Sequence, residues 1–191
     1  GAVKIGMLAT ADIIRVVADA IDAHRLSPVV LDPVMVAKGG SRLLEADAVE
    51  ALRSLLLPRA AVVTPNLGEA EVLTGMTVRD TAAMEAAARQ IVAAGAAAAL
   101  VKGGHLDSSQ IVDVLWDGEA MGHFESGRID TPHTHGTGCT LSAAIAAGLA
   151  LGLPLDDAVA RAHRYVQAAI RQAPGLGRGH GPLNHFPHVE R

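Results

Sequence analysis

Short runs of aliphatic and β-branched residues recur along this chain of 191 residues, with room for a helix between one run and the next. Four such runs cover residues 3–7, 29–31, 61–63 and 98–101. Continuous apolar runs of this length are typical of strands that are buried on both faces of a sheet. Strands that alternate with helices form βαβ units with right-handed crossovers. The sequence therefore predicts a layered α/β domain with a mostly parallel sheet.

Helical patterns fill the segments between these runs. Thr10 is a predicted N-cap, and the apolar residues after it fall on one helical stripe, namely Ile13, Val16, Val17, Ala20 and Ile21. A second helix is predicted from the spacing of Val49, Leu52 and Leu56. Thr81 is the candidate cap of a third helix, with the apolar positions Met84, Ala88, Ile91 and Val92. Two longer helices are expected over residues 138–151 and 154–172.

An Asp-Gly pair at residues 117–118 separates two further runs, over residues 111–116 and 120–127. Asp-Gly between two such runs is typical of a β-hairpin, so antiparallel strands are expected to extend the sheet. The chain length suits one domain, and we treat residues 1–191 as a single unit.

Charge and composition exclude several kinds of partner. Lys and Arg number 16 against 20 Asp and Glu, no basic block occurs, and aromatic residues make up only 2% of the chain. This composition disfavours nucleic acid and anionic membrane surfaces. The longest nearly apolar stretch, residues 139–155, is too short to span a membrane. The single cysteine, Cys139, cannot form an internal disulfide, which suits the cytoplasm. We therefore expect a cytoplasmic protein that acts on a small molecule.

Polar residues follow the predicted parallel strands at their carboxyl ends, where open α/β sheets bind ligands. These residues are Asp32, Thr64, Asn66, Glu69, Lys102 and His105. Carboxylates hold Mg²⁺ or its waters, and lysine binds phosphate as a point charge. The arrangement suits a magnesium-bound phosphate ligand. For each residue alone, helix capping or loop ordering is the alternative.

A Gly136-Thr137-Gly138 sequence opens the first of the two long helices. Glycines allow backbone N–H groups at the positive end of a helix to turn toward an anion. The sequence is not a Walker loop, because the Gly-Lys-Ser/Thr ending is absent. Cys139 comes next, and the helix N-terminus is expected to lower its pKa below about 8.5. The alternative is that Cys139 is a small buried apolar residue.

Two other chemistries are weaker alternatives. A metal site could use the histidines of the last third of the chain, namely His133, His135, His180, His185 and His188. Their spacing does not match a helical metal motif, and structural zinc would usually need more cysteines. A hydrolase could pair Cys139 with His135, but no third group to orient the histidine is evident.

Six motifs keep one order along essentially the whole chain. They are Lys4-Ile5-Gly6-Met7-Leu8, Val30-Leu31-Asp32-Pro33-Val34-Met35, Thr64-Pro65-Asn66-Leu67-Gly68-Glu69-Ala70-Glu71, Val101-Lys102-Gly103-Gly104-His105, His135-Gly136-Thr137-Gly138-Cys139-Thr140-Leu141-Ser142 and Gly179-His180-Gly181-Pro182-Leu183-Asn184-His185-Phe186. With these motifs the sequence resembles the bifunctional hydroxymethylpyrimidine and phosphomethylpyrimidine kinases of thiamin biosynthesis, which belong to the ribokinase-like superfamily. Most of that superfamily has Asp where this chain has Cys139, so the cysteine points to the pyrimidine kinases or to related pyridoxal kinases.

The resemblance implies a three-layer α/β/α fold and two ATP-dependent reactions. The first phosphorylates the hydroxymethyl group of 4-amino-5-hydroxymethyl-2-methylpyrimidine, and the second converts the monophosphate to the diphosphate. By the same resemblance, the amides of Gly136, Thr137 and Gly138 hold the transferring phosphoryl group, and Cys139 acts on the substrate hydroxyl as a base or a positioning group. The remaining implied roles are ATP binding by Lys102, Asn66 and Thr64, Mg²⁺ binding by Asp32 and Glu69 directly or through water, and packing on the pyrimidine ring by Met7 and Val34.

The resemblance also leaves alternatives open. Family members begin with further strand and helix segments before the residue that matches Val3, so we expect residues 1–191 to be an N-terminally incomplete kinase domain. The acceptor could instead be pyridoxal or pyridoxine, or the chain could bind nucleotide without catalysis. Kinases of this superfamily often dimerise, which leaves a homodimer open.

Overall fold

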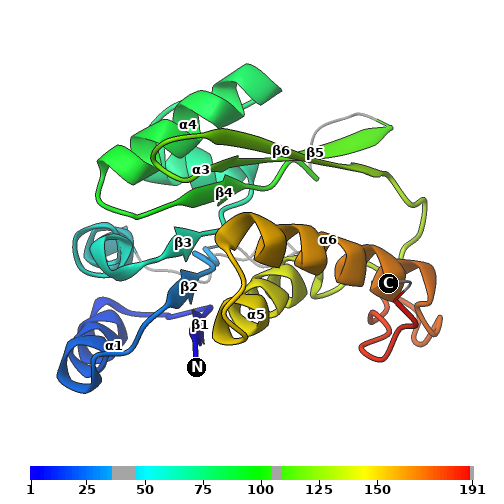
Figure 1. The fold of residues 1–191 in the computed structure, drawn as a ribbon, viewed down its shortest axis with the longest axis horizontal. Coiled ribbons are helices and arrows are strands. Elements are labelled where there is room, and N and C mark those ends of the chain that lie inside the picture. The colour runs from blue at the N-terminus through cyan, green and yellow to red at the C-terminus, as the bar shows by residue number, and fades with distance from the viewer. Residues whose placement is uncertain (36–45, 105–108, 190–191) are drawn as a thin grey trace.

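A single six-stranded sheet, in the order β1-β2-β3-β4-β5-β6, organises the computed structural model, which describes residues 1–35, 46–104 and 109–189. Its parallel strands are β1 (Val3–Ile5), β2 (Val29–Leu31), β3 (Val62–Val63) and β4 (Ala99–Val101). The hairpin of β5 (Gln110–Trp116) and β6 (Met121–Gly127) continues the sheet in antiparallel fashion. The predicted mostly parallel sheet with a hairpin addition is therefore confirmed (Figure 1).

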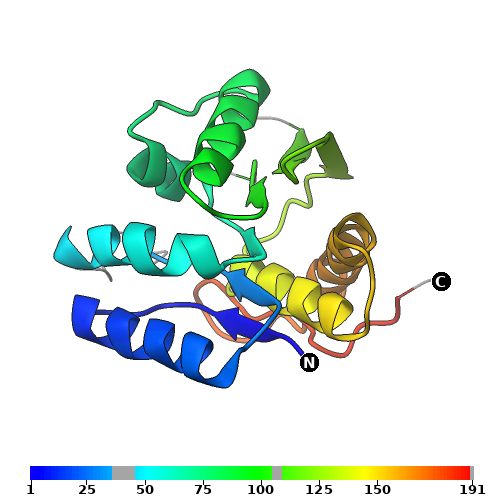
Figure 2. The ribbon, with the colours of Figure 1, turned by 60° about the vertical axis from the view of Figure 1, so that its left-hand side comes forward.

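Helices cover both faces of this sheet (Figure 2). One face packs against α1 (Ala11–His24), α2 (Ala46–Ala51), α3 (Leu67–Thr74) and α4 (Thr81–Ala93). The other face packs against α5 (Thr137–Ala150) and α6 (Leu155–Arg171). Successive strand residues point to opposite faces, so Val29 and Leu31 belong to the first core and Val30 to the second. The three-layer arrangement explains why these strands are continuously apolar.

The helix after Thr10 forms as predicted, but its buried face differs from the expected stripe. Thr10 caps α1 by accepting a hydrogen bond from the backbone N–H of Ile13. Side chains on the buried face are those of Ala11, Ile14, Ala18 and Ile21. Ile13 and Val16 are 45% and 68% exposed, so their place in the stripe was wrong. Two alanines beside Ile14 and Ile21 allow this face to pack closely on the sheet, while Ile13 and Val16 lie toward solvent.

Two other predicted helix boundaries are corrected in detail. Asp80, and not Thr81, caps α4, because its carboxylate accepts a hydrogen bond from the N–H of Ala83. The helix predicted from Val49 continues α2 into a π-helical segment, Leu52–Leu56, and a 3₁₀ turn, Leu57–Arg59. Both corrections shift a boundary without changing the order of the elements.

The two long helices α5 and α6 pack closely against each other (Figure 1). A Cβ atom on Gly148 would lie 2.9 Å from the Cβ atom of Ala158, so the contact requires a glycine on α5. This contact fixes α5, whose N-terminus carries the Gly-Thr-Gly-Cys sequence. Within the described parts of the chain, no helix combines the length and the apolar character that a membrane crossing requires.

Candidate functional site

Three charged side chains, those of Lys4, Asp32 and Lys102, form a cluster that joins residues of the first, second and fourth strand segments. Asp32 directly follows β2 and is 1% exposed. Its Oδ1 atom lies 3.0 Å from Nζ of Lys102, which directly follows β4. Its Oδ2 atom lies 3.4 Å from Nζ of Lys4, which lies within β1. Burial of a carboxylate is costly unless it is paired, and two ammonium groups provide that pairing here.

The electrostatic surroundings keep Asp32 ionised. Burial alone would raise the pKa of this carboxyl group, but the charges of Lys102 and Lys4 and hydrogen bonds from Lys102 and Cys139 outweigh it. The pKa of Asp32 is therefore below its ordinary value of 3.8, and the group is an anion at neutral pH. The predicted magnesium ligand thus faces two lysines, one of which the sequence analysis did not place in the site.

The N-terminus of α5 lies directly against this cluster. Gly136 caps the helix with a positive φ of 82°, a conformation that favours glycine, and no side chain caps this end. A Cβ atom on Gly138 would lie 3.2 Å from Nζ of Lys102, so the first turn approaches the ammonium group closely. The first amide N–H groups of a helix have no partner within the helix. Together with the ammonium group of Lys102 they form a site suited to an anion.

Cys139 extends from the same turn, and its predicted pKa shift was wrong in direction. The thiol is hydrogen-bonded to Asp32 and remains partly exposed. Burial and the negative charge of Asp32 raise the pKa of Cys139, while the charges of Lys4 and Lys102 act in the opposite direction. Burial and the full negative charge of Asp32 together outweigh the partial positive charge at the helix end. The thiol is therefore protonated at neutral pH.

Thr64 lies beneath the site and not on its surface. Its side chain is fully buried, and its hydroxyl oxygen lies 3.1 Å from that of Ser142 and 3.5 Å from Oδ1 of Asp32. Ser142 donates its own proton to the carbonyl oxygen of Gly138 at 2.8 Å. Thr64 has a single hydroxyl proton, which either the hydroxyl oxygen of Ser142 or Oδ1 of Asp32 can accept. This chain of hydrogen bonds ties the end of β3 to the first turn of α5.

Asn66 and Glu69 form a reciprocal capping box at the start of α3. The Asn66 side chain accepts from the N–H of Glu69 at 2.9 Å, and the Glu69 carboxylate accepts from the N–H of Asn66 at 2.7 Å. Burial, supported by the charge of Asp32, raises the pKa of Glu69, although Lys102 and the N–H groups of Asn66 and Met35 oppose the shift. The capping role considered for these residues is thus present in the structure, and the Glu69 carboxylate still faces the charged cluster.

The two residues predicted to contact a ring lie at the same edge of the sheet. Met7 follows β1 and is 54% exposed, and Val34 follows β2 and is partly buried. The backbone N–H of Val34 donates to the carbonyl oxygen of Asp32 at 2.8 Å, which bends the chain just after the strand. His105, predicted at this edge as well, lies outside the described residues.

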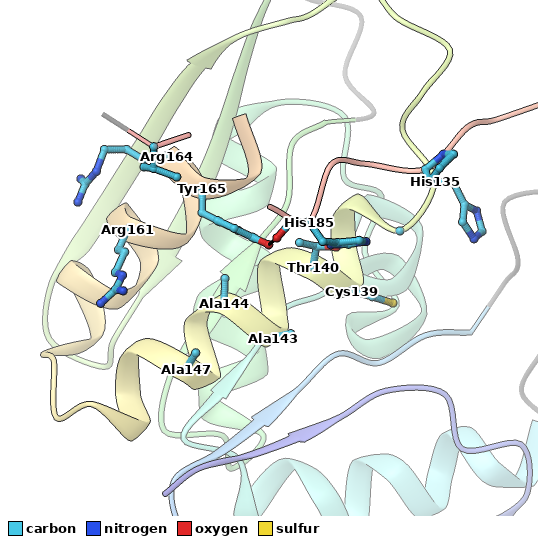
Figure 3. Close-up of a pocket in the computed structure, with 13 residues that line it drawn as sticks. His135, Cys139, Thr140, Ala143, Ala144, Ala147, Arg161, Arg164, Tyr165 and His185 are labelled. Atoms are coloured by element: carbon cyan, nitrogen blue, oxygen red, sulfur yellow. Dashed lines mark hydrogen bonds between the residues drawn. The ribbon is translucent and has the colours of Figure 1, made fainter. Parts of the chain in front are cut away.

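A cavity of about 920 Å³ lies beside the cluster, between α5, α6 and the C-terminal segment (Figure 3). Gly136 and Cys139 are the members of the predicted site that line it. Its other lining residues are His135, Thr140, Ala143, Ala144, Ala147, Arg161, Arg164, Tyr165, Pro182, His185 and Val189. The Tyr165 hydroxyl donates to the carbonyl oxygen of His185 at 2.9 Å, which ties the C-terminal segment to α6. The cavity thus adjoins the charged cluster only at the N-terminus of α5.

Sequence reasoning missed the residues that α6 contributes to this cavity. Arg161, Arg164 and Tyr165 recur at helical spacing, which was the available signal, but only the packing of α6 on α5 places them there. Of the histidines weighed as metal ligands, His135 and His185 line the cavity. In the described ranges, no three His, Cys, Asp or Glu side chains gather as a metal-binding group.

Comparison with known proteins places these features among related chains. Residues 1–184 match the family described as phosphomethylpyrimidine kinase. The thiamine biosynthesis bifunctional protein ThiED of Geobacter sulfurreducens is 52% identical over 184 residues, which are 96% of this chain and 38% of that protein. The hydroxymethylpyrimidine/phosphomethylpyrimidine kinase of Rhizobium meliloti is 50% identical over 188 residues, covering 97% of this chain and 70% of that protein.

Among solved structures, an ADP complex of Bacillus subtilis pyridoxal kinase is similar to this fold. The TM-score is 0.88 at 42% sequence identity, and the match covers 96% of this chain and 69% of that one. The similarity therefore extends over nearly all of the present chain and over about two thirds of its structural relative.

The hydrogen bond between Cys139 and Asp32 yields a prediction about thiol reactivity. Asp32→Asn removes the negative charge that raises the pKa of Cys139 and leaves the two lysines that lower it. We expect iodoacetamide to alkylate this variant several-fold faster than the wild-type protein at pH 8, because the thiolate is the nucleophile. Mass spectrometry reports on one site only, since Cys139 is the sole cysteine.

Asp117→Asn is the matched control, because it removes a carboxylate from the hairpin turn between β5 and β6. Its alkylation rate should equal that of the wild type. An Asp32→Asn variant that stays folded and reacts no faster than the wild type would contradict the electrostatic account of Cys139.

Proposed function

This chain belongs to the phosphomethylpyrimidine kinase family, and from that premise we propose that it transfers phosphate from ATP to a hydroxymethylpyrimidine. The acceptor is 4-amino-5-hydroxymethyl-2-methylpyrimidine, and in a second step its monophosphate is converted to the diphosphate. The names of its relatives, hydroxymethylpyrimidine/phosphomethylpyrimidine kinase and thiamine biosynthesis bifunctional protein, support this function. The resemblance inferred from the motifs is confirmed, and so is the ribokinase-like fold that it implied.

The observation that most supports the proposal is that the Lys102 ammonium group lies close to the first turn of α5. Phosphoryl transfer passes through a loose transition state and depends mainly on alignment and on neutralisation of phosphate charge. In our proposal the amides of Gly136, Thr137 and Gly138 hold the transferring group, and Lys102 contacts an ATP phosphate. ATP use is supported by the related kinase that was solved with ADP.

Cys139 positions the substrate hydroxyl in this proposal. Its raised pKa leaves the thiol protonated at neutral pH, which argues against a role as general base. A strong base is not required, because little proton transfer is needed before the loose transition state. Asp32 accepts a hydrogen bond from the thiol and so orients it.

Magnesium fits this site when it is shared with phosphate and water. Asp32 and Glu69 supply carboxylates, which are the protein ligands that Mg²⁺ prefers, and their charges act on each other. The absence of a three-residue metal cluster among the described side chains suits an ion that keeps its waters and binds phosphate oxygens. Mg²⁺ would neutralise phosphate charge. We propose that Asp32 and Glu69 hold it through water and that Asn66 contacts ATP beside it.

The remaining predicted residues take supporting or substrate-side roles. We propose that Met7 and Val34 pack on the pyrimidine ring, because both follow adjacent strands at the edge where Asp32 lies. Thr64 is fully buried, so its proposed role is to hold the first turn of α5 in place through Ser142. Residues 1–191 are proposed to act as one kinase domain. The cytoplasmic location and the homodimer stay predictions.

A pyridoxal kinase is the second candidate, because the related Bacillus subtilis structure carries that name. Mass spectrometry of the products from ATP with each alcohol, the hydroxymethylpyrimidine or pyridoxal, tests the proposal. We expect phosphorylation of the pyrimidine at higher kcat/KM, followed by the diphosphate. Faster turnover of pyridoxal would favour the second candidate. Binding of Mg-ATP at 100 times its Kd should stabilise the folded protein by about 2.7 kcal/mol. Such stabilisation without any product would indicate a nucleotide-binding module.

Replacement of the thiol tests the positioning role. Cys139→Ala removes the group that orients the substrate hydroxyl and leaves Lys102 and the helix amides in place. We expect kcat to fall about 10²-fold, because misplacement of the acceptor has effects of that size, while the Kd for ATP stays within about twofold. Steady-state kinetics and calorimetry measure the two quantities. An unchanged kcat would exclude the role.

Glu69→Gln separates capping from metal binding. Glutamine at this position still accepts the N–H of Asn66, so the capping box persists. Because burial raises the pKa of Glu69, loss of its charge should leave the Tm near neutral pH unchanged or higher. We expect the Mg²⁺ concentration for half-maximal activity to rise about tenfold or more.

The matched control is Glu71→Gln on the same helix, where the carboxylate accepts the N–H of Val78 outside the cluster. This variant should keep the wild-type magnesium dependence. A purely capping role for Glu69 would leave the magnesium dependence of both variants unchanged.

A further inference from the structure

A second buried carboxylate, Asp113, lies outside the charged cluster, in the middle of β5. It is 5% exposed. Its Oδ1 atom accepts a hydrogen bond of 2.7 Å from the backbone N–H of Gly103, and its Oδ2 atom lies 3.0 Å from Nε2 of His163 on α6. None of the roles proposed above uses these two side chains. Because a buried carboxylate is costly without partners, both contacts need a physical explanation.

The contact with Gly103 follows from how closely the backbone approaches β5. A Cβ atom on Gly103 would overlap the carbonyl oxygen of Val112 and would lie 3.2 Å from Cε of Met84. Only glycine fits there, and its N–H is buried against the strand. A buried N–H without an acceptor costs about 1–3 kcal/mol. The Asp113 carboxylate supplies that acceptor.

His163 is itself held in a defined orientation. Its ring stacks on Phe124, with centroids 5.5 Å apart and planes 25° apart. Phe124 is the cross-strand partner of Asp113 in the β5–β6 ladder, so carboxylate and aromatic ring lie side by side beneath α6. The side chain of His163 is 13% exposed. Nε2 of this ring approaches the carboxylate oxygen of Asp113 that does not accept from Gly103.

Gly103 connects this pair to the proposed phosphate site, because Lys102 is the preceding residue. The Lys102 backbone N–H donates to the carbonyl oxygen of Pro65 at 2.8 Å, and its ammonium group binds Asp32. Two hydrogen bonds thus hold the backbone on either side of the Lys102 side chain: one to Pro65, which comes after β3, and one from Gly103 to Asp113. A shift of the Gly103 amide would move the ammonium group relative to the first turn of α5.

We propose that Asp113 and His163 form a positioning pair that fixes the Lys102–Gly103 backbone, and through it the Lys102 ammonium group, for the phosphates of the nucleotide. The inference rests on the proposed function. Asp113 acts through the Gly103 amide, and His163 acts by orienting Asp113. Neither residue contacts ATP. The pair links α6 and the antiparallel hairpin to nucleotide binding.

Two variants of Asp113 provide the test. Asp113→Leu removes the acceptor, and we expect the KM for ATP to rise about tenfold or more while the KM for the alcohol changes little. Asp113→Asn keeps an oxygen for the Gly103 amide and should restore most of the ATP affinity. Asp117→Leu is the control, because it removes an acceptor of backbone N–H groups at the turn of the same hairpin. Its KM values should match the wild type.

His163→Phe keeps an aromatic ring against Phe124 and removes the nitrogen that faces Asp113. We expect it to raise the KM for ATP in the same direction as Asp113→Leu. If Asp113→Leu does not fold, this variant and Asp113→Asn still test the proposal. Folded variants whose KM for ATP equals that of the wild type, or equal increases for both substrates, would overturn the proposal.

Amide exchange measured by NMR separates this inference from the proposed function. In the wild type the Gly103 amide should exchange slowly, and in His163→Phe it should exchange faster while the amides of β5 stay protected. If the chain neither binds nor turns over ATP, the proposed function is wrong. The exchange rate of the Gly103 amide then still tests whether Asp113 and His163 hold this amide in place. Rapid exchange of the Gly103 amide in the wild type would overturn the inferred positioning pair.

Discussion

The ion pairing of Asp32 with Lys102 and Lys4 is the interaction on which the rest of the site depends. It joins β1 to the residues that follow β2 and β4, at a buried carboxylate that would be strongly destabilising without a partner. Asp32 also accepts a hydrogen bond from Cys139, so the same carboxylate connects the sheet to α5. The cluster therefore fixes both the ammonium group and the thiol that we place at the reacting phosphate.

Neutral hydrogen bonds complete this arrangement around the charges. The chain from Thr64 through Ser142 to the carbonyl oxygen of Gly138 holds the first turn of α5 on the end of β3. The capping box of Asn66 and Glu69 fixes the start of α3 at the same edge. Because hydrogen bonds within the protein hold each of these side chains, the polar groups of the site are preorganised, which is the condition for electrostatic stabilisation of a transition state.

Much of the fold could be predicted from the sequence, because buried strands of a parallel sheet must be apolar throughout. The buried face of α1 could not be predicted, since its alanines and larger aliphatic residues offer more than one apolar face. Only packing on the sheet determines that Ile14 is buried and Ile13 is not. The short helix α3 was missed, although the Asn66 to Glu69 spacing is a capping-box signal.

The candidate site could be predicted from the sequence only as far as the order of the strands in the sheet could be predicted. Asp32 and Lys102 follow predicted parallel strands, so their proximity follows from topology. The contribution of Lys4 depends on where the long side chain of a strand residue places its ammonium group, which no local pattern specifies. The pKa shift of Cys139 was predicted with the wrong sign, because burial of the thiol and the charge of Asp32, which is distant in the sequence, outweigh the local effect of the helix end.

The most direct test of the central claim is the affinity of Mg-ATP for wild-type protein and for Lys102→Gln, measured by calorimetry. A hydrogen bond to a charged group contributes about 1.5–3 kcal/mol, so the account predicts a Kd about 10 to 100 times higher in the variant. Thermal unfolding of both proteins checks that the variant is folded. Equal affinities in two folded proteins would contradict the assignment of this cluster to the phosphates of ATP.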